Sequence, residues 1–65
     1  MTNNDLLRRI RFVFDFNDTK MIAIFGQSAR DVSRAQISAW LKKEDDPAYQ
    51  ECDDKVLASF LNGLI

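Results

Sequence analysis

Apolar residues recur at helical spacing along most of the chain, and the clearest start signals belong to the stretch from Val32 to Lys43. Ser33 stands at the N-cap position and Gln36 follows three residues later, a pair that predicts a capping box. One apolar face follows at i, i+3 and i+4, formed by Ile37, Trp40 and Leu41. We therefore expect a capped helix here, with the only tryptophan of the chain pointing into the core.

The first stretch predicts a helix that is capped by Asn3 or Asn4 and runs to about Phe16. Its apolar face is unusually wide and is formed by Leu6, Leu7, Ile10, Val13, Phe14 and Phe16. Phe12 falls outside this face, so we expect its ring to be exposed in an isolated domain. An exposed ring of this kind indicates a second packing surface.

A second, shorter helix is predicted from about Thr19 to Phe25, with Asn17 or Asp18 as its cap. Gly26 is placed to end this helix as the C′ residue, in the left-handed conformation that glycine adopts without strain. The following five residues carry little apolar content, and we expect them to form a loop that leads into the capped helix.

The last helix is predicted from Asp54 to about Asn62, with Asp53 as its cap and Gly63 as its stop signal. Its apolar stripe is formed by Val56, Leu57, Phe60, Leu61 and Leu64. Pro47 predicts a single helical turn over residues 47–51. No segment alternates at strand spacing, so we expect an all-α fold, a compact bundle of four main helices with an additional short helical turn, in one domain over residues 1–65.

A domain of this length buries only about 60% of its unfolded surface, so its stability is marginal unless something supplements the core. A disulfide within the chain cannot do so, because Cys52 is the only cysteine, and a lone thiol fits a reducing compartment. The first residues are polar and the apolar runs are short, which predicts neither a secretory signal nor a membrane span. We expect a cytoplasmic protein.

The net charge of −1 gives no general affinity for nucleic acid, but the charges are unevenly distributed. Residues 1–43 carry eight basic and four acidic side chains, whereas residues 44–65 carry one basic and six acidic side chains. This asymmetry favours association of the front of one copy with the back of another. Neutralisation of the two halves within one fold is the more frequent arrangement, since protein surfaces usually mix both signs.

The residues that carry most enzyme chemistry are missing from this chain. It has no histidine, and the acidic neighbours Glu51, Asp53 and Asp54 favour a raised pKa for the Cys52 thiol, which indicates a structural cysteine. The acidic run before Pro47 lacks the spacing and the central glycine of an EF-hand loop, and no glycine-rich phosphate loop is present. We expect no catalytic residue, no cofactor, no metal site and no small-molecule substrate, and hence no enzyme.

The alternative from another functional class is a DNA-binding helix-turn-helix, formed by the two middle helices with Gly26 between them. The connection is longer than the tight turn of that motif, and the outward face of the capped helix carries mostly small side chains. The candidate nucleic-acid contacts are Arg8, Arg9, Arg11, Arg34 and Gln36. Local ion pairs explain the first three more simply, with Asp5 beside Arg8 and Arg9 and with Asp15 beside Arg11.

Three segments, R-R-I-R-F, W-L-K-K-E-D-D and C-D-D-K-V-L-A-S-F-L-N-G-L-I, resemble the YehS-like family of bacterial proteins, domain of unknown function 1456. The resemblance covers essentially the whole chain and implies no activity. It implies two such units in tandem, so a lone unit would leave bare the surface on which the units pack. We therefore expect a non-enzymatic protein-interaction module that forms a homodimer or binds a second copy of the same unit, with nucleic acid as the less favoured partner. The predicted interface is formed by Phe12, Phe16, Phe60, Leu64 and Ile65.

Overall fold

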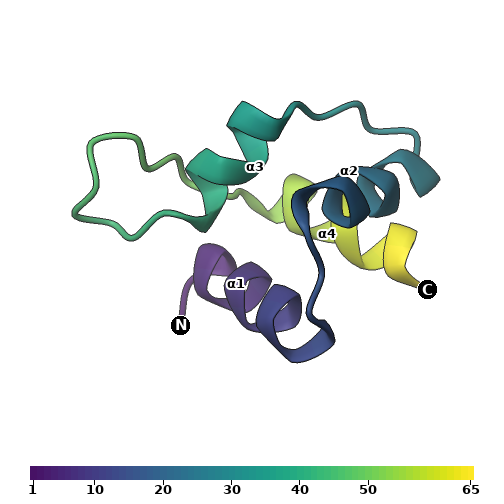
Figure 1. Ribbon diagram of the computed structural model, residues 1–65, viewed down its shortest axis with the longest axis horizontal. Helices are drawn as coiled ribbons and strands as arrows, with labels where there is room; N and C mark the ends of the chain where they lie inside the picture. Colours follow the sequence, from purple (N-terminus) through teal and green to yellow (C-terminus); the bar gives the residue numbers. More distant parts are fainter.

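The computed structural model describes residues 1–65 as four α-helices joined by three connections, with no strand (Figure 1). The helices are α1 (Asn3–Phe14), α2 (Asp18–Gln27), α3 (Arg34–Leu41) and α4 (Asp54–Leu64). The all-α prediction and the number of main helices are confirmed. The predicted caps Ser33 and Asp53 are also confirmed, as is Asn17, one of the two alternatives for α2.

The helices pack around a single apolar core. α2 lies against α4 over the most extensive contact, while α1 packs on α3 and α4 from the other side, and the connection between α3 and α4 extends outward (Figure 1). The ring of Phe25 lies at the centre, with centroid distances of 5.5 Å to Trp40 and 5.2 Å to Phe60. The fully packed residues are Leu7, Met21, Ile24, Phe25, Ile37, Trp40, Cys52, Val56 and Phe60. The prediction that the tryptophan points inward is confirmed.

The first helix begins and ends differently from the prediction. Thr2 is its N-cap: the Thr2 hydroxyl accepts the backbone N–H of Asp5, and the Asp5 carboxylate accepts the backbone N–H of Thr2. This reciprocal pair satisfies two backbone donors at once, so neither Asn3 nor Asn4 is needed as a cap. The helix ends at Phe14, because Asp15 adopts the left-handed conformation with φ 55°. The expected continuation to Phe16 is wrong.

The ends of α2 and α4 also correct the predictions made from glycine. Gly26 lies inside α2, and Ala29 adopts the left-handed conformation with φ 62° in its place. The N–H of Ala29 donates to the carbonyl of Gly26, and the N–H of Arg30 donates to the carbonyl of Phe25, as in a Schellman motif. Gly63 does not stop α4 either, since the helix continues to Leu64.

Gly63 instead permits the close approach of α4 to α2. A Cβ atom at this position would lie 1.8 Å from the backbone carbonyl oxygen of Ile24. Only a residue without a side chain allows the two backbones to approach so closely. The glycine that looked like a stop signal is therefore a packing residue at the most extensive helix contact of the fold.

The connection between α3 and α4 contains turns but no helix. The N–H of Asp46 donates to the carbonyl of Lys43, and the N–H of Tyr49 donates to the carbonyl of Asp46. The Asp46 side chain accepts the N–H of Ala48 at 2.8 Å, so this aspartate closes the second turn. The predicted single turn over residues 47–51 is thus a hydrogen-bonded β-turn over residues 46–49.

Candidate interaction surface

The last turn of α1 carries the largest exposed apolar feature within one helix. Phe12 is 84% exposed, Val13 72% and Phe14 58%. We call these three consecutive residues the α1 patch. The prediction that Phe12 is exposed is confirmed, whereas the prediction that Val13 and Phe14 face the core is wrong. No other helix covers the end of α1, so residues of its core-facing side also reach solvent there (Figure 1).

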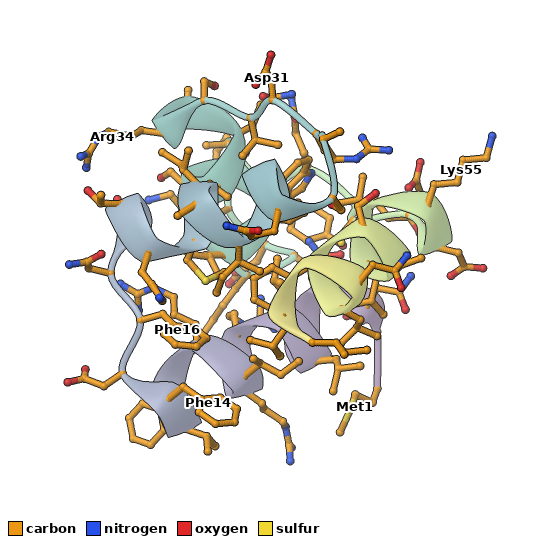
Figure 2. The ribbon with its side chains drawn as sticks, turned by 90° about the vertical axis from the view of Figure 1, so that its right-hand side faces the viewer. Met1, Phe14, Phe16, Asp31, Arg34 and Lys55 are labelled. Atoms are coloured by element: carbon orange, nitrogen blue, oxygen red, sulfur yellow. The ribbon has the colours of Figure 1, made fainter.

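The α1 patch continues through Phe14 to the half-buried ring of Phe16. The rings of Phe14 and Phe16 are stacked, with their centroids 5.3 Å apart and their planes 12° from parallel (Figure 2). Phe16 packs against the core and also lines a groove of about 330 Å³ between the α1–α2 connection, α2 and the end of α4. Gly63 and Leu64 line the same groove. The Phe14–Phe16 pair therefore links the end of α1 to the groove beside the end of α4.

Four of the five predicted interface residues reach this surface or the chain end, and one does not. Phe12 and Ile65 are exposed, and Phe16 and Leu64 are half-buried. Phe60 is completely buried against Phe25, so its assignment to an interface was wrong. Its position in the apolar stripe of α4 gave no means of separating the core face from an outer face, because the half-buried leucines Leu57, Leu61 and Leu64 belong to the same stripe.

The outward side of α1 also bears charged residues beside the α1 patch. A shallow hollow of about 630 Å³ is lined by Asp5, Arg8, Arg9, Phe12 and Val13. Arg8 forms an ion pair with Asp5 and donates to the backbone carbonyl of Lys42 at 2.7 Å, which confirms the predicted Asp5–Arg8 pair. Arg9 is exposed and has no acidic partner within ion-pair distance. The hollow therefore presents one uncommitted positive charge next to exposed apolar groups.

The other candidate nucleic-acid contacts are mostly held by hydrogen bonds within the chain. Arg34 donates to the Thr19 hydroxyl at 2.9 Å, and the Gln36 side chain accepts the backbone N–H of the residue that caps α3. The predicted pair of Arg11 with Asp15 is not formed, and the Nε atom of Arg11 is buried without a hydrogen-bond partner. These contacts do not support DNA binding, which stays a prediction from the sequence.

Asn4, which the sequence suggested only as a helix cap, is buried at the start of α1 and joins three segments. Its Nδ2 atom donates to the backbone carbonyls of Trp40 at 2.9 Å and Gln50 at 2.8 Å. Its Oδ1 atom accepts the backbone N–H of Cys52 at 2.8 Å and the hydroxyl of Tyr49 at 3.2 Å. Both N–H donors and both acceptor lone pairs of the amide form hydrogen bonds, so Asn4 fixes the α3–α4 connection to α1.

The sequence does indicate that Asn4 is not a cap, because T-N-N-D at residues 2–5 fits the capping-box pattern with Thr2 in the cap position. Nothing in the local sequence shows which carbonyls Asn4 would meet. Its partners lie between 36 and 48 residues away along the chain.

Three ionisable groups in or near this network have perturbed pKa values. Burial raises the pKa of the Tyr49 hydroxyl, with further contributions from Glu44 and Glu51. The backbone N–H of Thr2 lowers the pKa of Asp5, and the Thr2 hydroxyl and Arg8 act in the same direction. Burial raises the pKa of the Cys52 thiol to about 11, with smaller contributions from Asp53 and Asp54 that outweigh the opposing effect of Arg30. The thiol is therefore protonated and enclosed at neutral pH, as expected for a structural cysteine.

No three histidine, cysteine, aspartate or glutamate side chains are grouped in a way that could hold a metal ion. None of the four helices combines the length and the apolar character that crossing a bilayer requires.

Comparison with known proteins gives two matches. The model of a family described as "Protein of unknown function (DUF1456)" matches residues 3–65. A protein of Escherichia coli (strain K12) named "Uncharacterized protein YehS" is 42% identical over 65 residues, which are 100% of this chain and 42% of that protein. The chain thus spans less than half the length of this relative. No solved structure is significantly similar to it.

Proposed function

The chain belongs to the DUF1456 family, which confirms the resemblance to YehS-like proteins, and from this premise we propose that it is a non-enzymatic interaction module that associates with a second copy of itself. The family name supplies no activity. The proposal therefore depends on the surface of this domain. A second copy is the simplest partner, because it presents the same apolar surface.

The observation that carries the proposal is the α1 patch. Phe12, Val13 and Phe14 are consecutive, and each exposes more than half of its surface. Burying a phenylalanine or valine side chain contributes roughly 1.5–3 kcal/mol, so leaving all of them in water forgoes several kcal/mol in a domain of marginal stability. Contiguous apolar residues rimmed by charge are typical of protein interaction sites, and Arg9 provides such a rim here.

Small size adds a second reason. A chain of 65 residues has a limited core, and self-association through an apolar, two-fold contact is a common way for such a domain to bury more apolar surface. The same contact would serve equally between two domains of this kind within a longer protein. Either arrangement uses the same face of α1.

Sedimentation equilibrium from micromolar to millimolar concentration tests the proposal. We expect a reversible dimer, and we expect Phe12→Ser to weaken it by at least about tenfold, because each dimer loses two buried rings. Ile65→Ser removes an exposed apolar side chain outside the α1 patch and is expected to weaken the dimer less. A wild-type chain that stays monomeric at every concentration would contradict the proposal.

The alternative function is tested with the same samples. A short random-sequence duplex is added at low salt, and the salt concentration is then raised. A complex that forms and dissociates as salt increases would favour DNA binding, because phosphate contacts release counterions. We expect no such complex.

A further inference from the structure

We propose that two copies associate through antiparallel α1 helices, related by a two-fold axis near Phe12 and Val13, with Arg9 of each copy beside Asp15 of the other. This arrangement rests on the proposed self-association and specifies its geometry. It makes the interface isologous, so that one surface patch serves both copies.

The position of the axis follows from the apolar residues. Phe12 and Val13 are the two most exposed apolar residues of α1, and they lie next to each other in its last turn. Both copies bury these side chains against each other only if the axis passes close to them. In an antiparallel pair, the residues that follow Phe12 in one copy then lie over the residues that precede it in the other. The hollow beside Arg9 is therefore covered by the end of α1 of the second copy.

The charges select the antiparallel direction. Arg9 and Asp15 are both exposed, and neither makes an ion pair within the chain, where Asp5–Arg8 is the one such pair. With a helical rise of about 1.5 Å per residue, Arg9 lies roughly 4.5 Å before Phe12, and Asp15 lies a similar distance after it. Antiparallel helices that cross at Phe12 thus bring Arg9 level with Asp15 of the second copy. Parallel helices would instead place Arg9 beside Arg9 and Asp15 beside Asp15.

The backbone at Asp15 supports an intermolecular role for its carboxylate. Asp15 has φ 55°, and its side chain leaves the helix where α1 ends. The N–H of Asp15 donates to the carbonyl of Phe12 and the N–H of Phe16 donates to the carbonyl of Arg11, so the backbone here is held in place. The predicted partner within the chain, Arg11, does not reach the Asp15 carboxylate. The carboxylate is therefore positioned at the edge of the α1 patch and free to accept a donor.

A double-mutant cycle tests this pairing by sedimentation equilibrium, with Arg9→Gln, Asp15→Asn and the double variant. Asparagine tolerates the left-handed conformation, so Asp15→Asn removes the charge without straining the backbone. We expect each single change to weaken the dimer roughly three- to tenfold, since each dimer holds two such pairs near its rim. The double variant should be no weaker than the weaker single variant, because both changes remove the same pair.

Lys55→Gln is the matched control. It removes one positive charge as Arg9→Gln does, but Lys55 points to solvent away from Phe14 and the end of α1 (Figure 2). We expect it to leave the dimer constant unchanged. Circular dichroism and melting temperature establish that every variant is folded.

The outcomes distinguish a failure of the antiparallel pairing from a failure of self-association. A wild-type dimer that is unaffected by Arg9→Gln and Asp15→Asn, or for which the two losses simply add, would overturn the antiparallel pairing while self-association stands. A wild-type chain without any dimer would overturn the proposed function itself. Coupled losses that disappear at high salt would support the pairing, because salt screens ion pairs at an exposed rim.

Discussion

Replacement of Asn4 by alanine removes the only buried polar side chain of the domain, and its effect can be estimated from the contacts of that side chain. The change deletes two donated and two accepted hydrogen bonds. The backbone carbonyl of Trp40 and the backbone N–H of Cys52 lose their partner inside the protein, at sites that are buried. The carbonyl of Gln50 belongs to an exposed residue and can accept water instead.

The magnitude follows from the two buried backbone groups. Leaving a buried donor or acceptor unsatisfied costs about 1–3 kcal/mol, so we expect Asn4→Ala to lower the free energy of unfolding by about 3 kcal/mol. A chain of this size has a total stability of roughly 3–10 kcal/mol. The variant is therefore expected to have lost a large share of its stability, and the α3–α4 connection should detach first.

Two measurements on the same samples check this expectation. Urea unfolding is followed by the fluorescence of Trp40, the single tryptophan, and the opening of the connection is followed by the rate at which a thiol reagent labels Cys52. Asn3→Ala is the control, since Asn3 makes one exposed bond, to Asp54 at 2.7 Å, and should cost less than about 1 kcal/mol. An Asn4→Ala variant as stable as Asn3→Ala, with equally slow labelling, would refute the reasoning.

Three further predictions concern helix packing, helix ends and pH. Gly63→Ala should destabilise by about 2 kcal/mol, because its Cβ would collide with the Ile24 carbonyl, and an unchanged melting temperature would contradict the close approach. Gly26→Ala should stabilise by about 1 kcal/mol, since a Cβ there meets nothing within 4 Å inside a helix, and Ala29→Gly should stabilise by about 0.5–1 kcal/mol by relieving its positive φ. Destabilisation by Gly26→Ala would contradict its place inside α2, and destabilisation by Ala29→Gly would contradict the left-handed conformation of Ala29. The pKa of Cys52 is about 11 in the folded chain and about 8.5 when unfolded. The contribution of this thiol to the free energy of unfolding should therefore be fully present below pH 8.5 and be lost as the pH rises towards 11. Urea midpoints that fall equally with pH in the wild type and in Cys52→Ala would exclude this contribution.

The helix starts were predictable where a cap and its partner lie within four residues. Ser33 with Gln36 and Asp53 before α4 are local signals, and the structure uses them as predicted. Thr2 with Asp5 is a signal of the same kind, and the prediction failed there because asparagine is also a strong cap residue. The local pattern was sufficient, but the prediction chose Asn3 or Asn4 as the cap and did not consider Thr2.

The helix ends depended on contacts between distant segments. Glycine is the usual residue at a left-handed C′ position, yet here Asp15 and Ala29 occupy such positions while both glycines lie inside helices. Gly63 is needed against the carbonyl of Ile24, which lies 39 positions earlier in the chain. No local pattern distinguishes a glycine that ends a helix from one that admits a neighbouring backbone.

The candidate surface was predictable in part. Phe12 stood outside the apolar face of the first helix, and its exposure followed from helical periodicity alone. Val13 and Phe14 fitted the buried face, and only the three-dimensional arrangement shows that no other helix covers the last turn of α1. The helical spacing of Phe60 suits a core residue and an interface residue equally well. Its complete burial depends on Phe25 of a different helix.

The central claim is that the end of α1 is an interface between copies, and amide chemical shifts recorded during dilution test it most directly. Spectra of an isotope-labelled chain are compared from millimolar to micromolar concentration. We predict concentration-dependent shifts for residues 9–16, with little change for residues 34–41 of α3. Spectra that do not change with concentration, or changes confined to α3 and the acidic connection, would contradict the claim.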